Sequence, residues 1–162
     1  MITQSELKKQ LKYNESTGIF TWNLTKSGVL IGSIAGCESG GYITIGLFGK
    51  PRSAHRLAFL YMTGEIPEQV DHINHKKADN RWGNLRPANN KINQQNKPLS
   101  KANKSGFNGV VWSKKSNKWH SNIHIGDKNI SLGFFDNIFD AINARKKANK
   151  KYGFHKNHGM AI

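Results

Sequence analysis

The sequence contains a single cysteine, Cys37, and no long run of apolar residues. One cysteine excludes an internal disulfide and a zinc site built from several cysteines. Without an apolar run of about 18 residues we expect no transmembrane helix, and the first residues lack the apolar segment of a signal peptide. We therefore expect no membrane partner and a reducing, cytoplasmic setting.

Acidic side chains are scarce. The 162 residues include 10 Asp and Glu against 25 Lys and Arg, which gives a formal net charge of +15. Residues 1–85 carry 10 basic and 7 acidic side chains, or +3, whereas residues 86–162 carry 15 basic and 3 acidic, or +12. Lysines that only hydrate a surface do not require this asymmetry. A positive field attracts a polyanion, so nucleic acid is the expected partner and residues 86–162 are its anchor.

The residue patterns predict an α+β chain of two small domains. Hydrophobic residues make up only 36% of the sequence, which suits thin cores. Alternation of β-forming residues and apolar spacing of 3.6 residues locate the elements. Expected helices are 4–13 after a Thr3 to Glu6 capping box, 53–63, 88–96, and one from an Asp136 cap to Gly153; expected strands are 18–22, 42–48, 70–73, 84–86, 109–113, 119–125 and 130–134. We expect domains at 1–97 and 105–155, joined by a polar linker at 98–104.

The densest group of chemically useful side chains begins with Asp71 and His72 and continues to Asn84 and Asn93. Hydrolysis of a phosphodiester needs a base for the water, a cation beside the developing charge and help for the leaving oxygen. A carboxylate next to a histidine supplies a metal ligand and a base. Adjacent side chains of a regular strand point to opposite sides, so we expect a bend at the strand end to aim both into one pocket.

The spacing resembles the HNH endonuclease family, particularly phage and intron-encoded homing enzymes. Asn84 follows His72 by twelve positions and Asn93 follows it by twenty-one, within a match that runs from His55 to Asn96. The resemblance implies a ββα unit around one metal at about 68–97. It implies His72 as general base, Asp71 and Asn93 as metal ligands, and Asn84 as the residue that fastens the loop holding His72. Where the family often has His, Asn93 offers an amide oxygen, which favours Mg²⁺ or Mn²⁺ over zinc.

Residues 105–153 resemble an AP2 domain through the order Gly109-Val110, Lys118-Trp119 and Leu132-Gly133-Phe134. The resemblance implies a three-stranded sheet that enters the major groove of DNA and is backed by one helix. Alternation independently turns Trp119, Ile123 and Ile125 toward that helix and the polar residues between them toward DNA. The arginines with which plant members read bases are missing from this face, so contacts to phosphates should dominate. The expected contacts on this domain are Val111, Trp112, Ser113, Lys114, Lys115, Lys118, His120, Asn122, His124, Lys128, Asn129 and Ser131.

Several histidines have alternatives that the sequence leaves open. His55 and Arg56 lie on an expected helix, and we include them among the DNA contacts although they could merely pack and solvate. His75 is expected in an exposed loop. His120 and His124 lack a third metal ligand nearby, which favours a role facing DNA.

These observations predict a homing-type, metal-dependent endonuclease of double-stranded DNA with no small-molecule cofactor, working in a bacterial or phage-infected host cell. One active site per chain favours nicking of one strand by a monomer over paired cuts by a dimer. The alternative is a DNA-binding regulator in which the HNH-like unit is structural. An RNA binder is disfavoured because the expected sheet lacks exposed aromatics in a base-stacking pattern.

Overall fold

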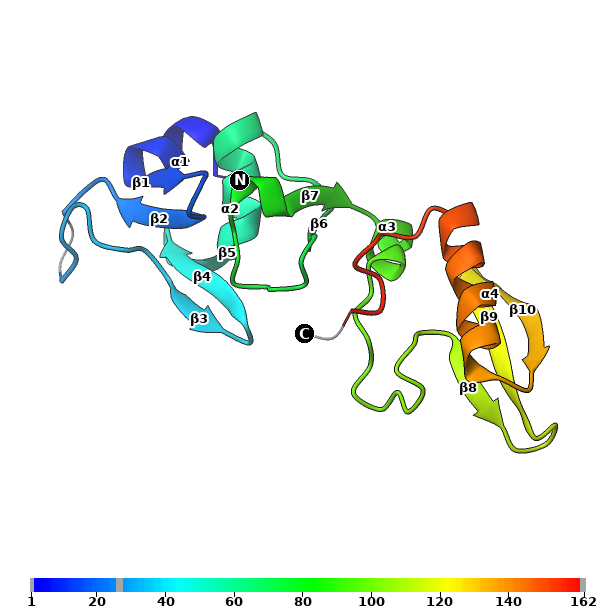
Figure 1. Cartoon of the computed structure of the whole chain (residues 1–162). Helices are drawn as coiled ribbons and strands as arrows, with labels where there is room; N and C mark the ends of the chain where they lie inside the picture. The colour runs from blue at the N-terminus through cyan, green and yellow to red at the C-terminus, as the bar shows by residue number, and fades with distance from the viewer. Residues whose placement is uncertain (1, 26–27, 161–162) are drawn as a thin grey trace. The chain divides into compact units, whose positions relative to one another are not determined.

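The computed structural model describes residues 2–25 and 28–160. Its described residues form four α-helices and several small antiparallel sheets, a mixed α+β fold (Figure 1). The chain divides into two compact units, Met1–Asn89 and Asn90–Ile162. Within the described residues, no helix has the length and apolar character needed to cross a membrane.

The N-terminal unit begins with a short helix and a hairpin. Helix α1 (Gln4–Gln10) has the expected capping box, in which the Thr3 hydroxyl accepts from the Glu6 N–H and the Glu6 carboxylate accepts from the Thr3 N–H. The expected continuation of this helix to Tyr13 is wrong, because β1 (Leu11–Asn14) pairs there with β2 (Ile19–Trp22). Leu11 and Tyr13 are buried and the residues between and after them are exposed, so a two-residue alternation prevails over helical spacing.

A three-stranded meander and one helix complete the core of this unit. Strands β3 (Cys37–Ser39), β4 (Tyr42–Leu47) and β5 (Lys50–Ser53) lie in that order, and β5 leads directly into α2 (Ala54–Thr63). The sequence did not predict β3 or β5, since both are short and β5 contains a proline. The buried side chains include Leu7, Leu11, Phe20, Ile45, Leu47 and Leu57. They fix α2 against the meander.

A second small sheet carries the candidate site. Strands β6 (Gln69–His72) and β7 (Leu85–Ala88) are antiparallel, with Asp71 opposite Arg86 and His72 opposite Leu85. The connection between them ends in a short 3₁₀ turn, η1 (Trp82–Asn84). Both strands were predicted to within two residues, so the sequence located this part of the fold.

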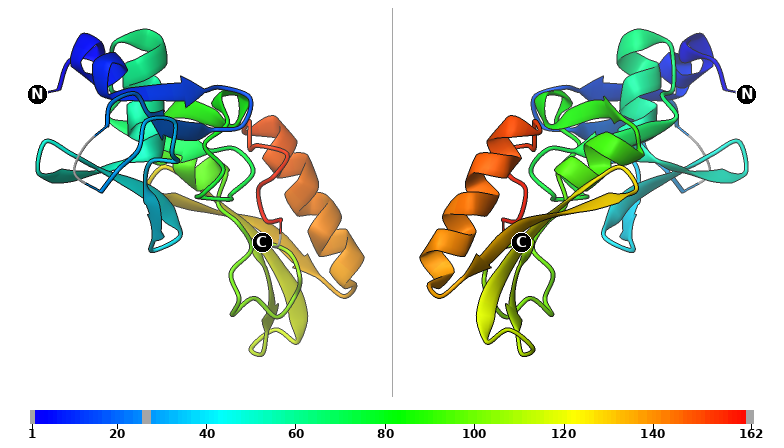
Figure 2. Two further views of the ribbon diagram at one scale, coloured as in Figure 1. Left: turned by 90° about the vertical axis from the view of Figure 1, so that its left-hand side faces the viewer. Right: turned by 90° about the vertical axis from the view of Figure 1, so that its right-hand side faces the viewer.

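The C-terminal unit is a three-stranded sheet with a helix on one face, as Figures 1 and 2 show. Strand β9 (Lys118–Ile125) lies between β8 (Val110–Ser113) and β10 (Lys128–Phe135), and α4 (Ile138–Lys151) buries Ala141, Arg145 and Ala148. The expected Asp136 cap of α4 is wrong. The side chain of Asn137 accepts from the Phe139 N–H, because the chain turns into the helix one residue later than expected.

Helix α3 (Asn90–Gln95) groups with the C-terminal unit, whereas we expected the first domain to extend to residue 97. Gln95 Nε2 donates to the Tyr152 carbonyl at 2.9 Å, and the backbone carbonyl of Gln95 accepts from the His155 N–H at 3.1 Å. Farther along, the Gly159 N–H donates to the Lys97 backbone carbonyl at 2.9 Å, and the Leu99 N–H donates to the Met160 backbone carbonyl at 3.0 Å. The polar residues 98–104 are predicted to form a linker. The backbone at Lys97 and Leu99 is instead hydrogen-bonded to Gly159 and Met160.

Gly18 supplies a test of how the hairpin supports the β6–β7 connection. Its φ is +75°, and a side-chain carbon there would collide with the backbone of Asn80 and Arg81. We expect Gly18→Ala to lower the free energy of unfolding by about 3 kcal/mol, measured by urea denaturation. Gly32→Ala is the matched control, since Gly32 has φ +82° and nothing within 4 Å. It should cost about 1 kcal/mol, and equal losses in the two variants would contradict the packing argument.

Candidate active site

Asp71 and His72 stand at the end of β6 and face different neighbours. Both lie within the regular pairing with β7, so their side chains alternate across the sheet, and the expected bend that would aim both into one pocket is wrong. The Asp71 carboxylate oxygen Oδ2 accepts from Arg86 Nη2 at 2.7 Å and from Nε at 3.0 Å. His72 is only 5% exposed and contacts another set of residues. The strand therefore offers a carboxylate and an imidazole side by side in sequence, each with its own surroundings.

The imidazole of His72 is held by Asn80. His72 Nε2 lies 3.1 Å from Asn80 Oδ1, and Asn80 Nδ2 donates to the Ala78 carbonyl at 3.3 Å. Because the Ala78 carbonyl can only accept, it fixes the orientation of the amide and turns the Asn80 oxygen toward the ring. His72 Nε2 then carries the proton, and Nδ1 carries the lone pair. The asparagine is itself buried, and the Tyr13 hydroxyl donates to its backbone carbonyl at 2.6 Å.

Burial governs the charge of this ring. It lowers the pKa of His72 below the usual range, more strongly than the Asn80 hydrogen bond and the nearby Asp71 raise it. A histidine with a lowered pKa is neutral at neutral pH, the form that accepts a proton. The site thus presents a neutral imidazole of defined tautomer.

A second histidine packs against the first. The ring centroids of His55, on α2, and His72 lie 5.1 Å apart at 73°, and the Tyr42 ring lies 5.3 Å from that of His55. Burial, followed by the charges of His72 and Arg56, lowers the pKa of His55 to about 4. Arg56 Nη1 donates to the Glu68 carbonyl at 3.0 Å. The two residues, expected as DNA contacts, are half-buried and engaged inside this unit.

The connection from β6 to β7 is closed by polar side chains. Asn84 Oδ1 accepts from the Asn74 N–H at 3.0 Å, and Asn84 Nδ2 donates to the Asp79 carbonyl at 2.7 Å. The Asp79 carboxylate pairs with Arg81 at 2.6 Å, and the hydrogen bonds from Arg81 and Asn74 lower the pKa of Asp79 to about 2. His75 also lies in this connection, with φ 65°, and it is half-buried rather than exposed as expected. The side-chain amide of Asn84 therefore links the backbone at Asn74 to the backbone at Asp79 within this connection.

The donor set suits a hard cation with few protein ligands. In the described ranges, no group of three His, Cys, Asp or Glu side chains could hold a metal ion. Asp71 offers a carboxylate whose side chain is 16% exposed. Asn93, the other ligand that the family resemblance implies, lies on α3 in the C-terminal unit and has an amide oxygen. Mg²⁺ keeps several waters and binds one or two carboxylates together with substrate phosphates. These oxygen donors fit Mg²⁺ better than zinc.

Several of the other predicted contacts lie on the face of the C-terminal sheet that points away from α4. On this face, strand pairing places His120 opposite both Phe134 and Val111, Asn122 opposite Ser131, and His124 opposite Asn129. The His120 ring stacks on Phe134, with centroids 4.5 Å apart, and its Nε2 lies 3.0 Å from Ser131 Oγ. Trp112 is opposite Trp119 and therefore lies on the other face, the one toward α4, where it is 45% exposed and its ring meets that of Trp119 edge-on. Ser113, at the end of β8, lies opposite Lys118.

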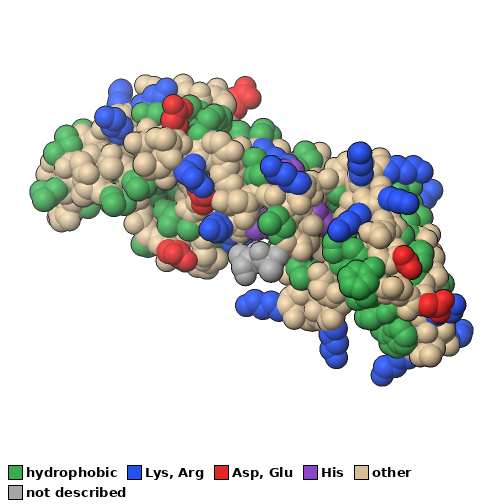
Figure 3. Space-filling view, viewed as in Figure 1, with side chains coloured by type: hydrophobic (Ala, Val, Ile, Leu, Met, Phe, Trp, Pro, Cys, Tyr) green, Lys and Arg blue, Asp and Glu red, His purple; other side chains and the backbone are tan. Residues whose placement is uncertain are grey.

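Basic side chains surround this sheet. Lys114, Lys115 and Lys128 are exposed, whereas Lys118 pairs with Asp136 at 3.1 Å. Figure 3 shows lysine and arginine side chains spread over the C-terminal unit on the face in view. Residues 90–162 hold 14 basic and 3 acidic side chains, or +11. The surface is electrostatically suited to a polyanion.

Sequence reasoning missed two of these residues. Asn80 is not among the predicted site residues, since nothing in the sequence shows that its amide reaches His72. Phe134, which the sequence pattern did not place on this face, is 51% exposed there and stacks on His120. A register shift between Ser131 and Gly133 brings Phe134 opposite His120, which simple alternation does not predict.

Comparison with known proteins identifies one segment. Residues 52–95 match the family model described as HNH endonuclease. The match covers α2, β6 and β7, and includes Asp71, His72, Asn84 and Asn93. It supports a nuclease whose substrate is DNA, in a family that generally uses a divalent metal. Searches of curated proteins and of solved structures gave no match.

The lowered pKa of His55 predicts a pH-dependent stability. Between about pH 6.5 and 4 the unfolded chain binds a proton at this position and the folded chain does not, so the free energy of unfolding falls as the pH falls through this window. The contribution is at most about 3 kcal/mol. His55→Gln removes the titrating group, so its unfolding free energy should change less with pH in urea denaturation at pH 7, 6 and 5. Parallel pH curves for the two proteins would contradict the burial argument.

Proposed function

We propose that this chain is a metal-dependent HNH endonuclease that hydrolyses a phosphodiester bond of double-stranded DNA. The observation that supports this most is the neutral, oriented imidazole of His72 inside the segment that matches the HNH family. A general base must be unprotonated at the working pH and oriented to accept a proton. A purely structural histidine would not need these properties together with Asp71, Asn84 and Asn93.

His72 acts as the general base. Its Nε2–H donates to Asn80, so Nδ1 takes a proton from the attacking water. Asn80 stabilises the imidazolium that forms, because its oxygen accepts a hydrogen bond from the protonated ring. Asn84 acts indirectly, by closing the connection that carries Asn80.

Asp71 holds the divalent metal, with Asn93 as a further ligand implied by the family spacing. When bound, Mg²⁺ or Mn²⁺ stabilises negative charge that develops on the phosphate. Arg86 orients the Asp71 carboxylate through two hydrogen bonds to one of its oxygens. Each side chain at the end of β6 thus has its own task.

The C-terminal unit targets the enzyme to DNA. We propose that residues 105–155 act as an AP2-like module in a homing-type enzyme, with the face of His120, Asn122 and His124 toward the major groove. The charge of +11 and the polar outer face support this role. Missing arginine readers make phosphate contacts more important than base contacts. One catalytic histidine per chain favours a monomer that nicks one strand.

Replacement of the general base should remove cutting and keep binding. We expect His72→Asn to lower the cleavage rate about 10²- to 10⁴-fold, because asparagine cannot take the proton, while affinity for duplex DNA in gel shifts stays near that of the wild type. His75→Asn is the matched control, since it makes the same change at a residue with positive φ that asparagine tolerates. A His72→Asn variant that cuts at the rate of His75→Asn would remove His72 from the mechanism.

Loss of an oxygen ligand should raise the metal concentration that cleavage requires. We expect Asp71→Asn and Asn93→Ala to shift the midpoint of a Mg²⁺ titration of cleavage upward several-fold, because each weakens or removes a donor. Asp127→Asn, in an exposed turn, serves as the control for a lost carboxylate. Unchanged midpoints in both test variants would show that the ligands are misassigned.

A further inference from the structure

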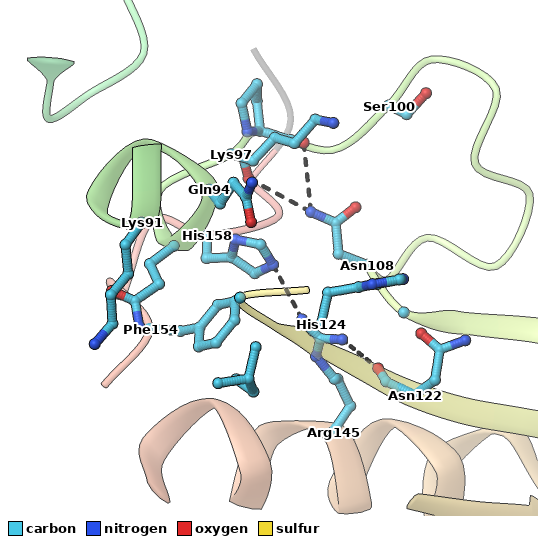
Figure 4. A pocket seen from close by; sticks show the side chains of 15 residues that line it. Lys91, Gln94, Lys97, Ser100, Asn108, Asn122, His124, Arg145, Phe154 and His158 are labelled. Atoms are coloured by element: carbon cyan, nitrogen blue, oxygen red, sulfur yellow. Dashed lines mark hydrogen bonds between the residues drawn. The ribbon is translucent and has the colours of Figure 1, made fainter. Parts of the chain in front are cut away.

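A cavity of about 540 Å³ lies in the C-terminal unit, apart from the residues of the proposed active site. It is bounded by α3, the segment that follows it, β9, α4 and the chain after α4 (Figure 4). Among the described residues that line it, none is acidic. Its ionisable lining comprises Lys91, Lys97, His124, Arg145 and His158. A wall with this composition has a positive potential.

Arg145 is the buried cation of this wall. It is 4% exposed, and within residues 2–25 and 28–160 no carboxylate lies at ion-pairing distance from it. Burial lowers the pKa of Arg145 to about 10, which leaves the guanidinium charged at neutral pH. A buried charge is costly unless a partner of opposite sign compensates it. The protein's own described side chains supply no such partner.

The contacts of Arg145 within the protein use only some of its N–H donors, which leaves the others for a ligand. Nη1 donates to the Asn122 carbonyl, Nε to Asn149 Oδ1 at 2.8 Å, and Nη2 lies 3.3 Å from His158 Nε2. A guanidinium has five N–H donors, and these contacts use three. Gly109 makes room for the group, because a side-chain carbon at its φ of +75° would collide with the guanidinium. The arginine is therefore held in place while it lines the cavity.

Two exposed lysines and one exposed histidine complete the entrance. Lys91 is on α3 and Lys97 follows that helix, and both are exposed. His124 lines the cavity and belongs to the polar face of the sheet. The cavity is thus continuous with the surface proposed to meet DNA.

We propose that this cavity is a phosphate-binding site, with Arg145 as the fixed charge and Lys91 and Lys97 at its entrance. A phosphate group compensates the buried guanidinium and accepts its remaining N–H donors. The phosphate comes from the DNA backbone or from a free phosphate. Its assignment to DNA rests on the proposed function, whereas the phosphate site itself does not.

Calorimetric titration of the full-length chain with inorganic phosphate, at an ionic strength matched with chloride, tests the site. We expect saturable binding that is at least about tenfold weaker in the double variant Lys91→Ala/Lys97→Ala, since each exposed lysine contributes charge without a packing role. The matched control, Lys147→Ala/Lys150→Ala, removes the same charge from exposed positions of α4 that do not line the cavity, and it should bind phosphate like the wild type. Absence of saturable binding, or equal weakening in both double variants, would overturn the proposal.

A second titration identifies the source of the phosphate. Protein saturated with duplex DNA in the absence of divalent metal should show no phosphate binding if a backbone phosphate fills the site. Lys91→Ala/Lys97→Ala should then reduce the log-log salt slope of DNA binding by about 1.8. Undiminished phosphate binding to the DNA-saturated protein would overturn the assignment to DNA and leave a free phosphate as the ligand. Neither titration involves cleavage, so failure of this site and failure of the nuclease are distinguishable.

Discussion

The hydrogen bond between His72 Nε2 and Asn80 Oδ1, 3.1 Å long, joins the end of β6 to the connection that returns to β7. The proposed chemistry depends on it, because it determines which ring nitrogen carries the lone pair. The N-terminal hairpin supports the bond from a distance in sequence. Tyr13 of β1 donates to the Asn80 backbone, and Gly18 allows the same backbone to approach closely. The site therefore rests on the core of its unit as well as on the matched segment.

The two units differ in how their ionisable side chains are neutralised or paired. Around His72, burial keeps two imidazoles neutral, and the carboxylates of Asp71 and Asp79 are each paired with an arginine. The C-terminal unit instead carries a large positive excess and one deeply buried arginine with no carboxylate partner in the described part of the chain. Such an excess is unfavourable for an isolated domain and favourable for one that binds a polyanion. Neutral imidazoles in one unit and a positively charged surface in the other agree with the proposal of an enzyme that acts on DNA.

Short-range spacing predicted much of this fold. The pattern of β-forming and helix-forming residues located β6, β7 and the helix after them, and alternation located β8, β9 and β10. Prediction failed where long-range packing decided between patterns. Leu11 fits both a helix and a strand, and only its pairing with Trp22 selects the strand. Likewise, the register shift in β10 that exposes Phe134 leaves no mark in the sequence.

The candidate site was predictable as a set of residues and only partly as an arrangement. Residue types and spacing singled out Asp71, His72 and Asn84, because phosphodiester hydrolysis needs a base and oxygen ligands. They could not show that Asn80 sets the tautomer, since a contact between side chains eight positions apart depends on how the connection folds. Nor could they show that His55 packs against the His72 ring, because α2 and β6 meet only in the tertiary structure.

The central claim is that this chain cuts DNA with the help of a divalent metal. Incubation of the wild-type protein with supercoiled plasmid, in Mg²⁺ and in EDTA, tests it most directly. The account predicts conversion to open circle in Mg²⁺, without early linear product, and no conversion in EDTA. Supercoiled plasmid that is bound but uncut in both Mg²⁺ and Mn²⁺ would contradict the account and favour a DNA-binding regulator with a structural HNH-like unit.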